Sequence, residues 1–350
     1  MRVGIRNRPW AGLDVGTYSV KLLALQPGVG GVKHFAAELP LRRAAGADGA
    51  IPDEQMAHIL SETLSLAGLS PRSLKGVSLG VSGSDVIVKQ IPLPLMDDAE
   101  VAGALRFEAR KHLPFDLQSM VIDYQLIGRY PGEKRLDVLL AAVPQARLDR
   151  ALVPLRLLGI DADIVDAAPL ALTNALSRQA ERESESRVLL DIGHQGSWFT
   201  LYQKGAPYFS RRLDFGGVSV TQAISSALRI PFAEAEEWKL EAGADDPSMR
   251  VTADSREMAA VNEALQQLAD ELRRTFAFYR TMAPLPDPLT VWLSGSTARL
   301  PGLTGRLSAL LDIPTFTFNP LDALGAEHRA SAPAGGPQFA QAFGLALRSA

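Results

Sequence analysis

The chain contains no cysteine, which excludes disulfide bonds and thiolate metal sites and fits a reducing compartment. Other signatures are missing too. There is no glycine-rich loop ending in Gly-Lys-Ser/Thr and no Gly-X-Ser-X-Gly turn, so the key residues of P-loop NTPases and of α/β-hydrolases are missing here. The histidines show no metal-ligand spacing. The chemistry must come from other residue types.

Long apolar runs and basic clusters are also absent. Residues 10–25 are interrupted by Asp14, Gly16 and Lys21, and no run approaches the ~20 apolar residues that span a bilayer. The basic start at residues 1–9 lacks the apolar stretch of a signal peptide. With a net charge of −3 and dispersed lysine and arginine, nothing predicts nucleic-acid binding. We expect a cytoplasmic protein that reaches a membrane through a partner, without direct membrane insertion.

Two similar acidic turns stand out in what is present. Asp14 and Asp191 each end an apolar strand-like run, and a glycine follows two residues later, Gly16 and Gly193. Two carboxylates facing each other across a cleft can hold Mg²⁺, and glycine lets backbone N–H groups approach phosphate oxygens. A chain of 350 residues can build two such lobes. The pattern predicts a two-lobed nucleotide binder with a duplicated α/β core.

Neighbouring polar residues extend this site. Thr17, Ser19 and Ser197 can offer hydroxyls, and Lys21 can neutralise a phosphate. Glycine turns before helices, at Gly216-Gly217 and at Gly295-Ser296-Thr297, can seat a nucleotide against helical N–H groups. Each acidic turn alone is more typical of an ordinary tight hairpin than of a functional site, and Lys21 alone is equally typical of a solvated strand residue. His194 follows the second turn directly, and an exposed turn residue is its simpler interpretation.

Periodicity divides the chain into segments. A hairpin is expected at residues 10–26, a helix at 59–67 ending at Gly68, and a strand at 77–81. Residues 84–160 have their own order of strand, helix, strand, strand and helix. Prolines at 92 and 94 are expected to break a central strand, and Asp97 with Glu100 to start a helix that runs to His112. An apolar stripe at spacings of three and four predicts a long helix over residues 261–279.

Longer segments resemble a known family. Residues 12–22, 189–201 and 293–303 resemble the first phosphate, second phosphate and adenosine motifs of the actin-like ATPase superfamily, with Ser296 at the usual second glycine. More specific are residues 80–94, 230–239, 342–348 and above all 104–116, a helix followed by a Pro-Phe pair. These segments are similar to the PilM family, the actin-like proteins of type IV pilus assembly.

The resemblance implies a duplicated actin-like (ribonuclease H-like) core around a nucleotide cleft, with an inserted subdomain of the type found in the division protein FtsA. The implied parts are a first core subdomain at residues 10–83 and 161–178, the insert at 84–160, a second core subdomain at 187–225 and 288–350, and a smaller second-lobe subdomain at 226–282. The 161–178 segment includes a helix between the lobes.

The resemblance also implies the site and the partner. ATP and Mg²⁺ would be held at phosphate by Asp14, Gly16, Thr17, Lys21, Asp191 and Gly193, and at ribose and adenine by Gly216, Gly217, Glu236, Lys239, Gly295 and Ser296. Glu236 and Lys239 are otherwise expected to form a surface ion pair. The partner is the N-terminal cytoplasmic peptide of the inner-membrane protein PilN, with Phe107, His112, Leu113 and Phe115 as lining candidates. Leu113 and Phe115 could instead anchor the helix end in the core.

The implied function is an ATP-binding scaffold of the pilus inner-membrane platform with weak or no ATP hydrolysis, compatible with self-assembly. No catalytic residue is identified. Two alternatives stay open at this point. A sugar or acetate kinase of the same superfamily would need a catalytic base, and an FtsA-like division protein would need a basic amphipathic membrane tail, which the sequence to Ala350 does not show.

Overall fold

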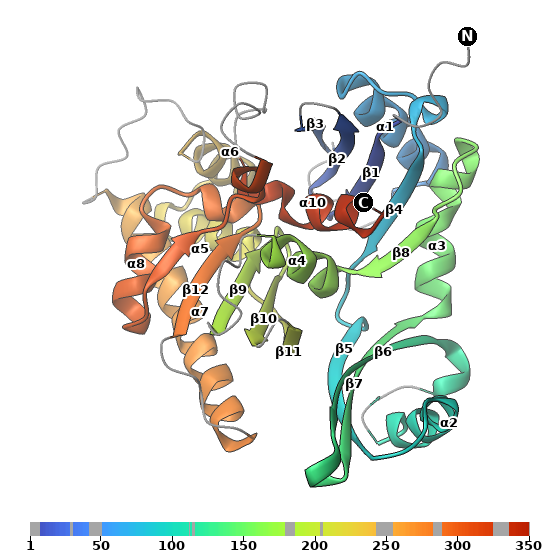
Figure 1. Ribbon diagram of the computed structural model, residues 1–350. Helices are drawn as coiled ribbons and strands as arrows, with labels where there is room; N and C mark the ends of the chain where they lie inside the picture. Colours follow the sequence, from blue (N-terminus) through green and yellow to red (C-terminus); the bar gives the residue numbers. More distant parts are fainter. Residues whose placement is uncertain are drawn as a thin grey trace.

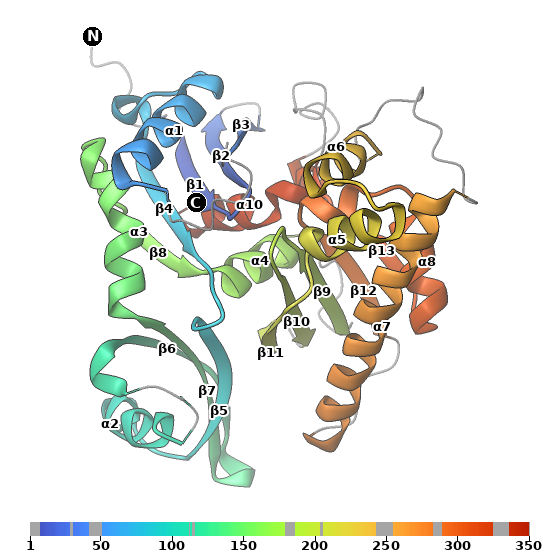
Figure 2. The ribbon, with the colours of Figure 1, turned by 180° about the vertical axis from the view of Figure 1, so that it is seen from behind.

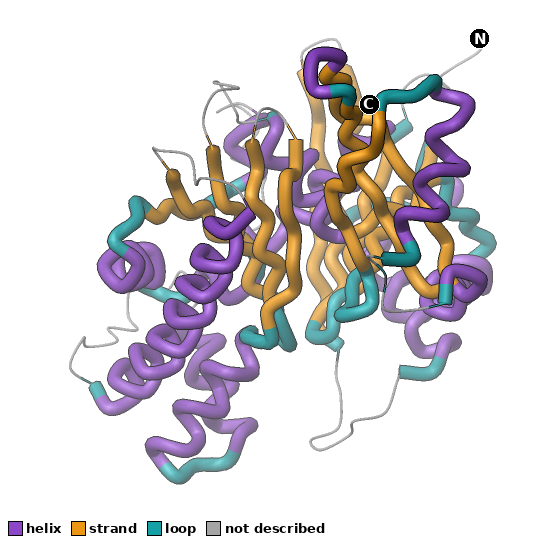
Figure 3. The backbone as a smooth tube through the Cα atoms, turned by 90° about the horizontal axis from the view of Figure 1, so that it is seen from below, coloured by secondary structure: helices purple, strands orange, loops and turns teal. Residues whose placement is uncertain are grey.

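Two β-sheets form the framework of the protein, as seen in a computed structural model (Figure 1). The structure describes residues 8–28, 31–41, 51–111, 113, 116–178, 186–203, 206–242, 255–282, 289–324 and 336–349. The strands gather in the middle of the molecule with helices around them (Figure 3).

The first sheet has five strands, and we call it with its helices the first lobe. Its order is β3 (Gly31–Pro40), β2 (Ser19–Gly28), β1 (Trp10–Val15), β4 (Gly76–Val81) and β8 (Ile164–Ala167). The expected hairpin is confirmed, because β1 and β2 pair antiparallel with Asp14 opposite Lys21. Helix α1 (Asp53–Leu66) packs on this sheet through Leu60 and Leu64, and Gly68, with a φ of +69°, ends it as predicted.

The second sheet has eight strands. The first five of them in the sheet order, together with helices α5 to α8, form what we call the second lobe. Their order is β13 (Thr315–Thr317), β12 (Leu289–Ser294), β9 (Ser186–Ile192), β10 (Ser197–Gln203) and β11 (Ala206–Leu213). The helices are α5 (Gly217–Leu228), α6 (Phe232–Ala242), α7 (Arg256–Met282) and α8 (Leu303–Leu311). Figure 2 shows α5 and α7 over one face of the sheet, with α6 beside α5. The predicted stripe of α7 is confirmed, since Leu265, Leu268 and Leu272 are fully buried.

The two lobes repeat one strand plan. In each, three antiparallel strands are followed by two parallel ones, in the orders β3-β2-β1-β4-β8 and β11-β10-β9-β12-β13. The registers agree as well: Asp14 pairs with Lys21 and Gly80, and Asp191 pairs with Trp198 and Ser294 at the corresponding places. The duplication suggested by the two acidic turns is therefore present in the backbone.

The inserted subdomain consists of β5 (Ile87–Pro94), α2 (Asp98–Ala109), β6 (Met120–Tyr130), β7 (Arg135–Pro144) and α3 (Gln145–Leu157). This is the element order that the sequence predicted. Strand β5 joins β11 of the second sheet at a single pair, Lys89 with Phe209. Glu100 accepts the N–H of Asp97 at the start of α2, as the capping pattern indicated.

Two details of the insert differ from expectation. Pro92 and Pro94 do not break a strand, because they lie within β5 beyond its contact with β11, where their missing N–H groups cost no ladder bond. Helix α2 ends at Ala109 instead of reaching His112, which lies outside the described residues. The domain limits drawn from the sequence stay a proposal.

A shared core joins the lobes and the insert. It contains Leu23 from β2, Val88 from β5, Leu172 from α4 (Ala168–Ser177), Trp198 from β10 and Phe343 from α10 (Ala340–Ala346). Helices α4 and α10 lie between the two sheets (Figure 1). Among the described helices, none is long and apolar enough to cross a membrane.

Helix α10 can approach its neighbours only because two glycines lack a side chain. A Cβ at Gly344 would overlap the carbonyl oxygen of Ala171 in α4, and a Cβ at Gly12 in β1 would overlap the carbonyl oxygen of Ala342. Backbone packed this closely has no room for even one methyl group.

We predict that Gly344→Ala lowers the free energy of unfolding by about 2 kcal/mol or more, because the methyl group forces α10 away from α4. Gly305 in α8 is the matched control, since no atom of the described residues lies within 4 Å of where its methyl group would stand. Gly305→Ala should stabilise the protein by about 0.5–1 kcal/mol through helix propensity. Urea unfolding of both variants measures this, and an unchanged Gly344→Ala midpoint would contradict it.

Candidate functional site

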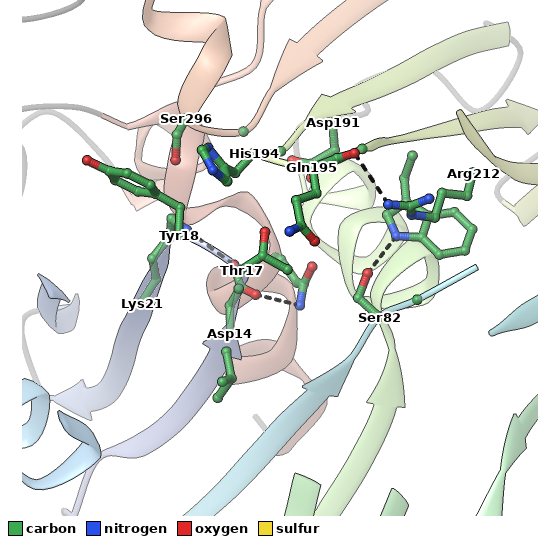
Figure 4. Close-up of a pocket in the computed structure, with 18 of the residues that line it drawn as sticks. Asp14, Thr17, Tyr18, Lys21, Ser82, Asp191, His194, Gln195, Arg212 and Ser296 are labelled. Carbon is green, nitrogen blue, oxygen red and sulfur yellow. Dashed lines mark hydrogen bonds and ion pairs between the residues drawn. The ribbon is translucent and has the colours of Figure 1, made fainter. Parts of the chain in front are cut away.

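A polar pocket of about 320 Å³ lies between the two lobes (Figure 4). The ends of β1 and β9 and the turns after them bring both aspartates to its wall. Of the residues predicted from sequence, those that line it are Asp14, Gly16, Thr17, Lys21, Asp191, Gly193, Gly295 and Ser296.

Asp14 is held from two sides. Its Oδ1 accepts a hydrogen bond of 3.0 Å from Nε2 of Gln341 in α10, and the Lys21 ammonium lies 3.8 Å from its Oδ2. Burial raises the pKa of Asp14, and the nearby Lys21 charge opposes that shift. Lys21 is itself buried and also lies 3.9 Å from Glu38, so it is not a solvated strand residue.

Asp191 has a different environment. Its Oδ1 accepts a hydrogen bond of 2.7 Å from Ser294 at the end of β12. Burial raises the pKa of Asp191 to about 6, the Ser294 hydrogen bond opposes the shift, and the negative charge of Asp14 adds to it. The two carboxylates therefore interact across one pocket instead of facing separate solvent regions.

Both acidic turns have the same tight geometry. The Gly16 N–H donates to Ser19 O at 3.0 Å, and the Gly193 N–H donates to Gly196 O at 3.1 Å. A Cβ at Gly193 would lie 2.8 Å from Gly196 O. The glycines are thus required by the turns themselves, and the turns leave backbone exposed to the pocket.

Three hydroxyls expected at the nucleotide are engaged elsewhere. Ser19 donates to Glu38 at 2.7 Å and Ser197 donates to Phe215 O at 2.5 Å, and both serines are fully buried. Thr297 donates to Gly193 O at 3.3 Å. These side chains brace the turns and do not line the pocket.

The glycine pair before α5 also braces the second turn. The N–H groups of Gly217 and Val218 donate to Gly193 O and His194 O, each at 2.8 Å. A Cβ at Gly216 would overlap His194 O. These two helical N–H groups are therefore used by the turn and are not directed at a ligand.

Glu236 and Lys239 form a buried ion pair, not the surface pair considered from sequence. Their charged atoms are 2.7 Å apart, and the Lys239 ammonium also donates to Thr221 at 2.8 Å and to Gly217 O at 3.0 Å. Burial lowers the pKa of Lys239, and Glu236 opposes the shift. The pair fixes α6 against α5.

Sequence reasoning missed several pocket residues: Tyr18, Ser82, Gly83, Arg147, Trp198, Arg212, Gln338 and Gln341. Tyr18 and His194 come from opposite lobes and their rings lie 4.9 Å apart, so His194 is more than an exposed turn residue. Gln338 and Gln341 are three residues apart, as on one face of a helix, and this spacing was only a weak signal in the sequence. Arg147 and Arg212 had none, because they belong to other segments that only folding brings to the pocket.

The partner-binding candidates separate in the structure. Phe107 on α2 is 67% exposed, beside a hollow of about 570 Å³ that Arg106 and Arg110 also line. Leu113 is buried in the core of the insert, which supports the anchoring alternative for this residue. His112 and Phe115 lie outside the described residues.

The raised pKa of Asp191 predicts a pH dependence of stability in the nucleotide-free protein. The native state holds this proton up to about pH 6, whereas the ordinary pKa is 3.8, so the contribution of Asp191 to stability should fall as pH rises between these values and stay level above. Asp191→Asn removes this contribution, so the free energy of unfolding of the variant minus that of wild type should increase from pH 4 to pH 6. Urea unfolding at each pH measures it, with exposed Asp161→Asn as control. Parallel curves for wild type and Asp191→Asn would contradict the prediction.

Comparison with known proteins agrees with this geometry. A family model described as type IV pilus assembly protein PilM matches residues 12–350. A solved PilM–PilN type IV pilus biogenesis complex is 27% identical, with 97% of each chain covered and a TM-score of 0.81. EutJ from Carboxydothermus hydrogenoformans is 15% identical (99% and 91% covered, TM-score 0.58), and MreB5 of Spiroplasma citri bound to AMPPNP is 14% identical (97% and 95% covered, TM-score 0.51). These neighbours confirm the predicted actin-like fold. The chain belongs to the PilM family of type IV pilus assembly proteins.

Proposed function

We propose that this protein is a nucleotide-binding scaffold of the type IV pilus assembly platform. It binds ATP with Mg²⁺ between its lobes and docks the N-terminal cytoplasmic peptide of PilN through its inserted subdomain. The main support for this proposal is that the two acidic turns meet at one pocket. Asp14 and Asp191 are close enough there for the charge of Asp14 to shift the pKa of Asp191.

The residues present fit a magnesium nucleotide. Two carboxylates that repel each other in a buried site are relieved by a divalent cation, and Mg²⁺ needs only one or two protein carboxylates when phosphates and water complete its shell. Asp14 and Asp191 would hold the ion or its waters, and Lys21 and the backbone at Gly16 and Gly193 would face the phosphates. The ion, when bound, neutralises phosphate charge.

On the adenosine side, Gly295 and Ser296 line the pocket. Gly295 has a φ of +87°, and a Cβ there would overlap Ile192 O, so this turn depends on glycine. We assign Gly216, Gly217, Thr297, Glu236 and Lys239 to support of the second phosphate turn, and Ser19 and Ser197 to support of their own strands.

Binding, with weak or no hydrolysis, is the role that the pocket supports. Among the described residues that line the pocket, the carboxylates are Asp14 and Asp191, which are the two candidate magnesium ligands. No further carboxylate of this lining is available to activate a water molecule or a sugar hydroxyl. The same feature disfavours the kinase alternative. The family match replaces the alternative of an FtsA-like division protein.

The solved PilM–PilN complex supports the choice of partner. Phe107 is the exposed aromatic residue of α2, its ring lies 5.6 Å from the Lys111 ammonium, and the adjoining hollow offers space for a short peptide. Aromatic side chains of this kind commonly dominate peptide interfaces. A PilN-type partner would recruit the protein from the cytoplasm to the inner membrane.

Nucleotide binding is tested by calorimetry with ATP in Mg²⁺ and in chelator. Asp14→Ala should weaken Mg-ATP binding about tenfold or more. The variant loses a carboxylate of the pocket and the hydrogen bond that this carboxylate accepts from Gln341. Asp270→Asn, on the distant exposed face of α7, should bind as wild type. A folded wild type that binds no ATP in either condition would refute the nucleotide proposal.

Peptide docking is tested with a synthetic PilN N-terminal peptide and fluorescence anisotropy. Phe107→Ala should weaken binding about tenfold or more through loss of the aromatic contact. Phe278→Ala is the matched control, because this residue is 53% exposed on α7 in the other lobe. Equal affinity of both variants with wild type would exclude the Phe107 surface while leaving the nucleotide proposal intact.

A further inference from the structure

Two arginines from separate parts of the chain reach the nucleotide pocket. We propose that Arg147 of the inserted subdomain and Arg212 of the second lobe bind the terminal phosphate of a nucleoside triphosphate and thereby make the position of the insert depend on that phosphate. This inference rests on the proposed nucleotide binding and adds the residues that distinguish a triphosphate from a diphosphate.

The internal duplication relates the turn that Arg147 contacts to the adenosine-side turn. Ser296 follows Ser294, the register partner of Asp191, by two residues, and Ser82 follows Gly80, the register partner of Asp14, in the same way. The Ser82 turn is thus the first-lobe counterpart of the adenosine-side turn at Ser296. Both serines line the pocket, and they lie on opposite sides of it (Figure 4).

Figure 4 agrees with this placement. Ser296 lies on one side of the pocket and Ser82 with Arg212 on the other, while Thr17 and Gln195 of the two acidic turns lie between them. A nucleotide with adenosine at Ser296 and phosphates at the turns points its last phosphate toward Ser82 and Arg212.

Arg212 packs against the second phosphate turn. A Cβ at Gly196 would overlap its guanidinium group, and Nη2 lies 3.5 Å from Gln195 O. Its ion-pair partner Asp214, at 2.7 Å, has a side chain that is 93% exposed. Because an exposed pair is weak in water, the guanidinium is available for a phosphate, which it can bind with two parallel hydrogen bonds.

Arg147 connects the insert to the same end of the pocket. It lies in the first turn of α3, its Nε is 2.6 Å from Asp85 Oδ1, and its Nη1 donates to Ser82 O at 3.2 Å. The indole N–H of Trp198 donates to the Ser82 hydroxyl at 3.0 Å. The Ser82 turn therefore contacts the second lobe and the insert at once, and a phosphate bound by Arg147 would act on both.

The charges of the pocket match such a ligand. Its lining has three side chains that are always cationic, Lys21, Arg147 and Arg212, and two carboxylates, Asp14 and Asp191. Lys21 lies near Asp14, and the arginines pair with Asp85 and Asp214, but neither of these two aspartates lines the pocket, so the arginines are the charged side chains at that end of its wall. A Mg-triphosphate is more negative than its diphosphate counterpart at that end, which favours the triphosphate.

The test measures ATP and ADP affinities with Mg²⁺ for wild type, Arg147→Ala and Arg212→Ala. Each variant should weaken ATP binding about tenfold or more and change ADP binding less than about threefold. The chain offers neighbouring controls. Arg150, one turn along α3, lines an adjoining cavity and not the nucleotide pocket itself, and Arg211, adjacent in β11, pairs with Glu271 at 3.5 Å. Arg150→Ala and Arg211→Ala should keep the wild-type ratio of affinities.

A second readout follows the insert itself. Since the chain has no cysteine, Glu133→Cys in the insert and Ala309→Cys in α8 can carry a fluorophore pair. Energy transfer should change with ATP and not with ADP, and Arg147→Ala should abolish the change. Three results would overturn this inference: the variants lose ATP and ADP affinity equally, their ratio of ATP to ADP affinity stays that of wild type, or Arg147→Ala keeps the ATP-dependent change in energy transfer. In each of these cases ATP binding by wild type still upholds the proposed function. No nucleotide binding by wild type would overturn both.

Discussion

The contact of α10 with α4 and β1 is the constraint on which the nucleotide pocket depends. Gly344 and Gly12 let the helix backbone touch its neighbours directly, and this places Gln341 within 3.0 Å of Asp14. The same helix contributes Phe343 to the core shared by both lobes and the insert. A closing helix near the end of the chain therefore orients a carboxylate near its beginning, and the geometry of the site is tied to the packing between the lobes.

The burial of charged groups determines what kind of ligand the pocket favours. Folding buries two carboxylates near each other, and the pKa of Asp191 is raised mainly by this burial, with a smaller contribution from the charge of Asp14. Lys21 and the hydrogen bonds from Gln341 and Ser294 only partly offset this. Under the proposed function, a magnesium nucleotide bound in this pocket would contact both lobes and stabilise the native state. The insert joins the same system where Arg147 meets Ser82.

Local patterns in the sequence were sufficient for the elements and for the acidic turns. An Asp-X-Gly turn after an apolar run, the stripe of α7 and Gly68 after α1 each depend on residues that are close in sequence, and the structure has them where predicted. The hydroxyls were harder to assign. Ser19 and Ser197 flank the turns in sequence, but the alternation of side chains along a strand directs them to Glu38 and Phe215 O. Pro92 and Pro94 were misread because whether a strand is central depends on its neighbours, which the local sequence does not reveal.

The sequence by itself determined the duplicated α/β plan, the two aspartates with their glycines, and the family. Only the tertiary structure decided which side chains share the pocket, since Arg147, Arg212 and Gln341 lie far from one another along the chain and meet only after both lobes and the insert have packed. It also made Glu236 and Lys239 a buried brace and Leu113 a core residue. The reason is physical: hydrogen bonding and periodicity within one segment are local, whereas burial and the distance between charges arise from packing between segments.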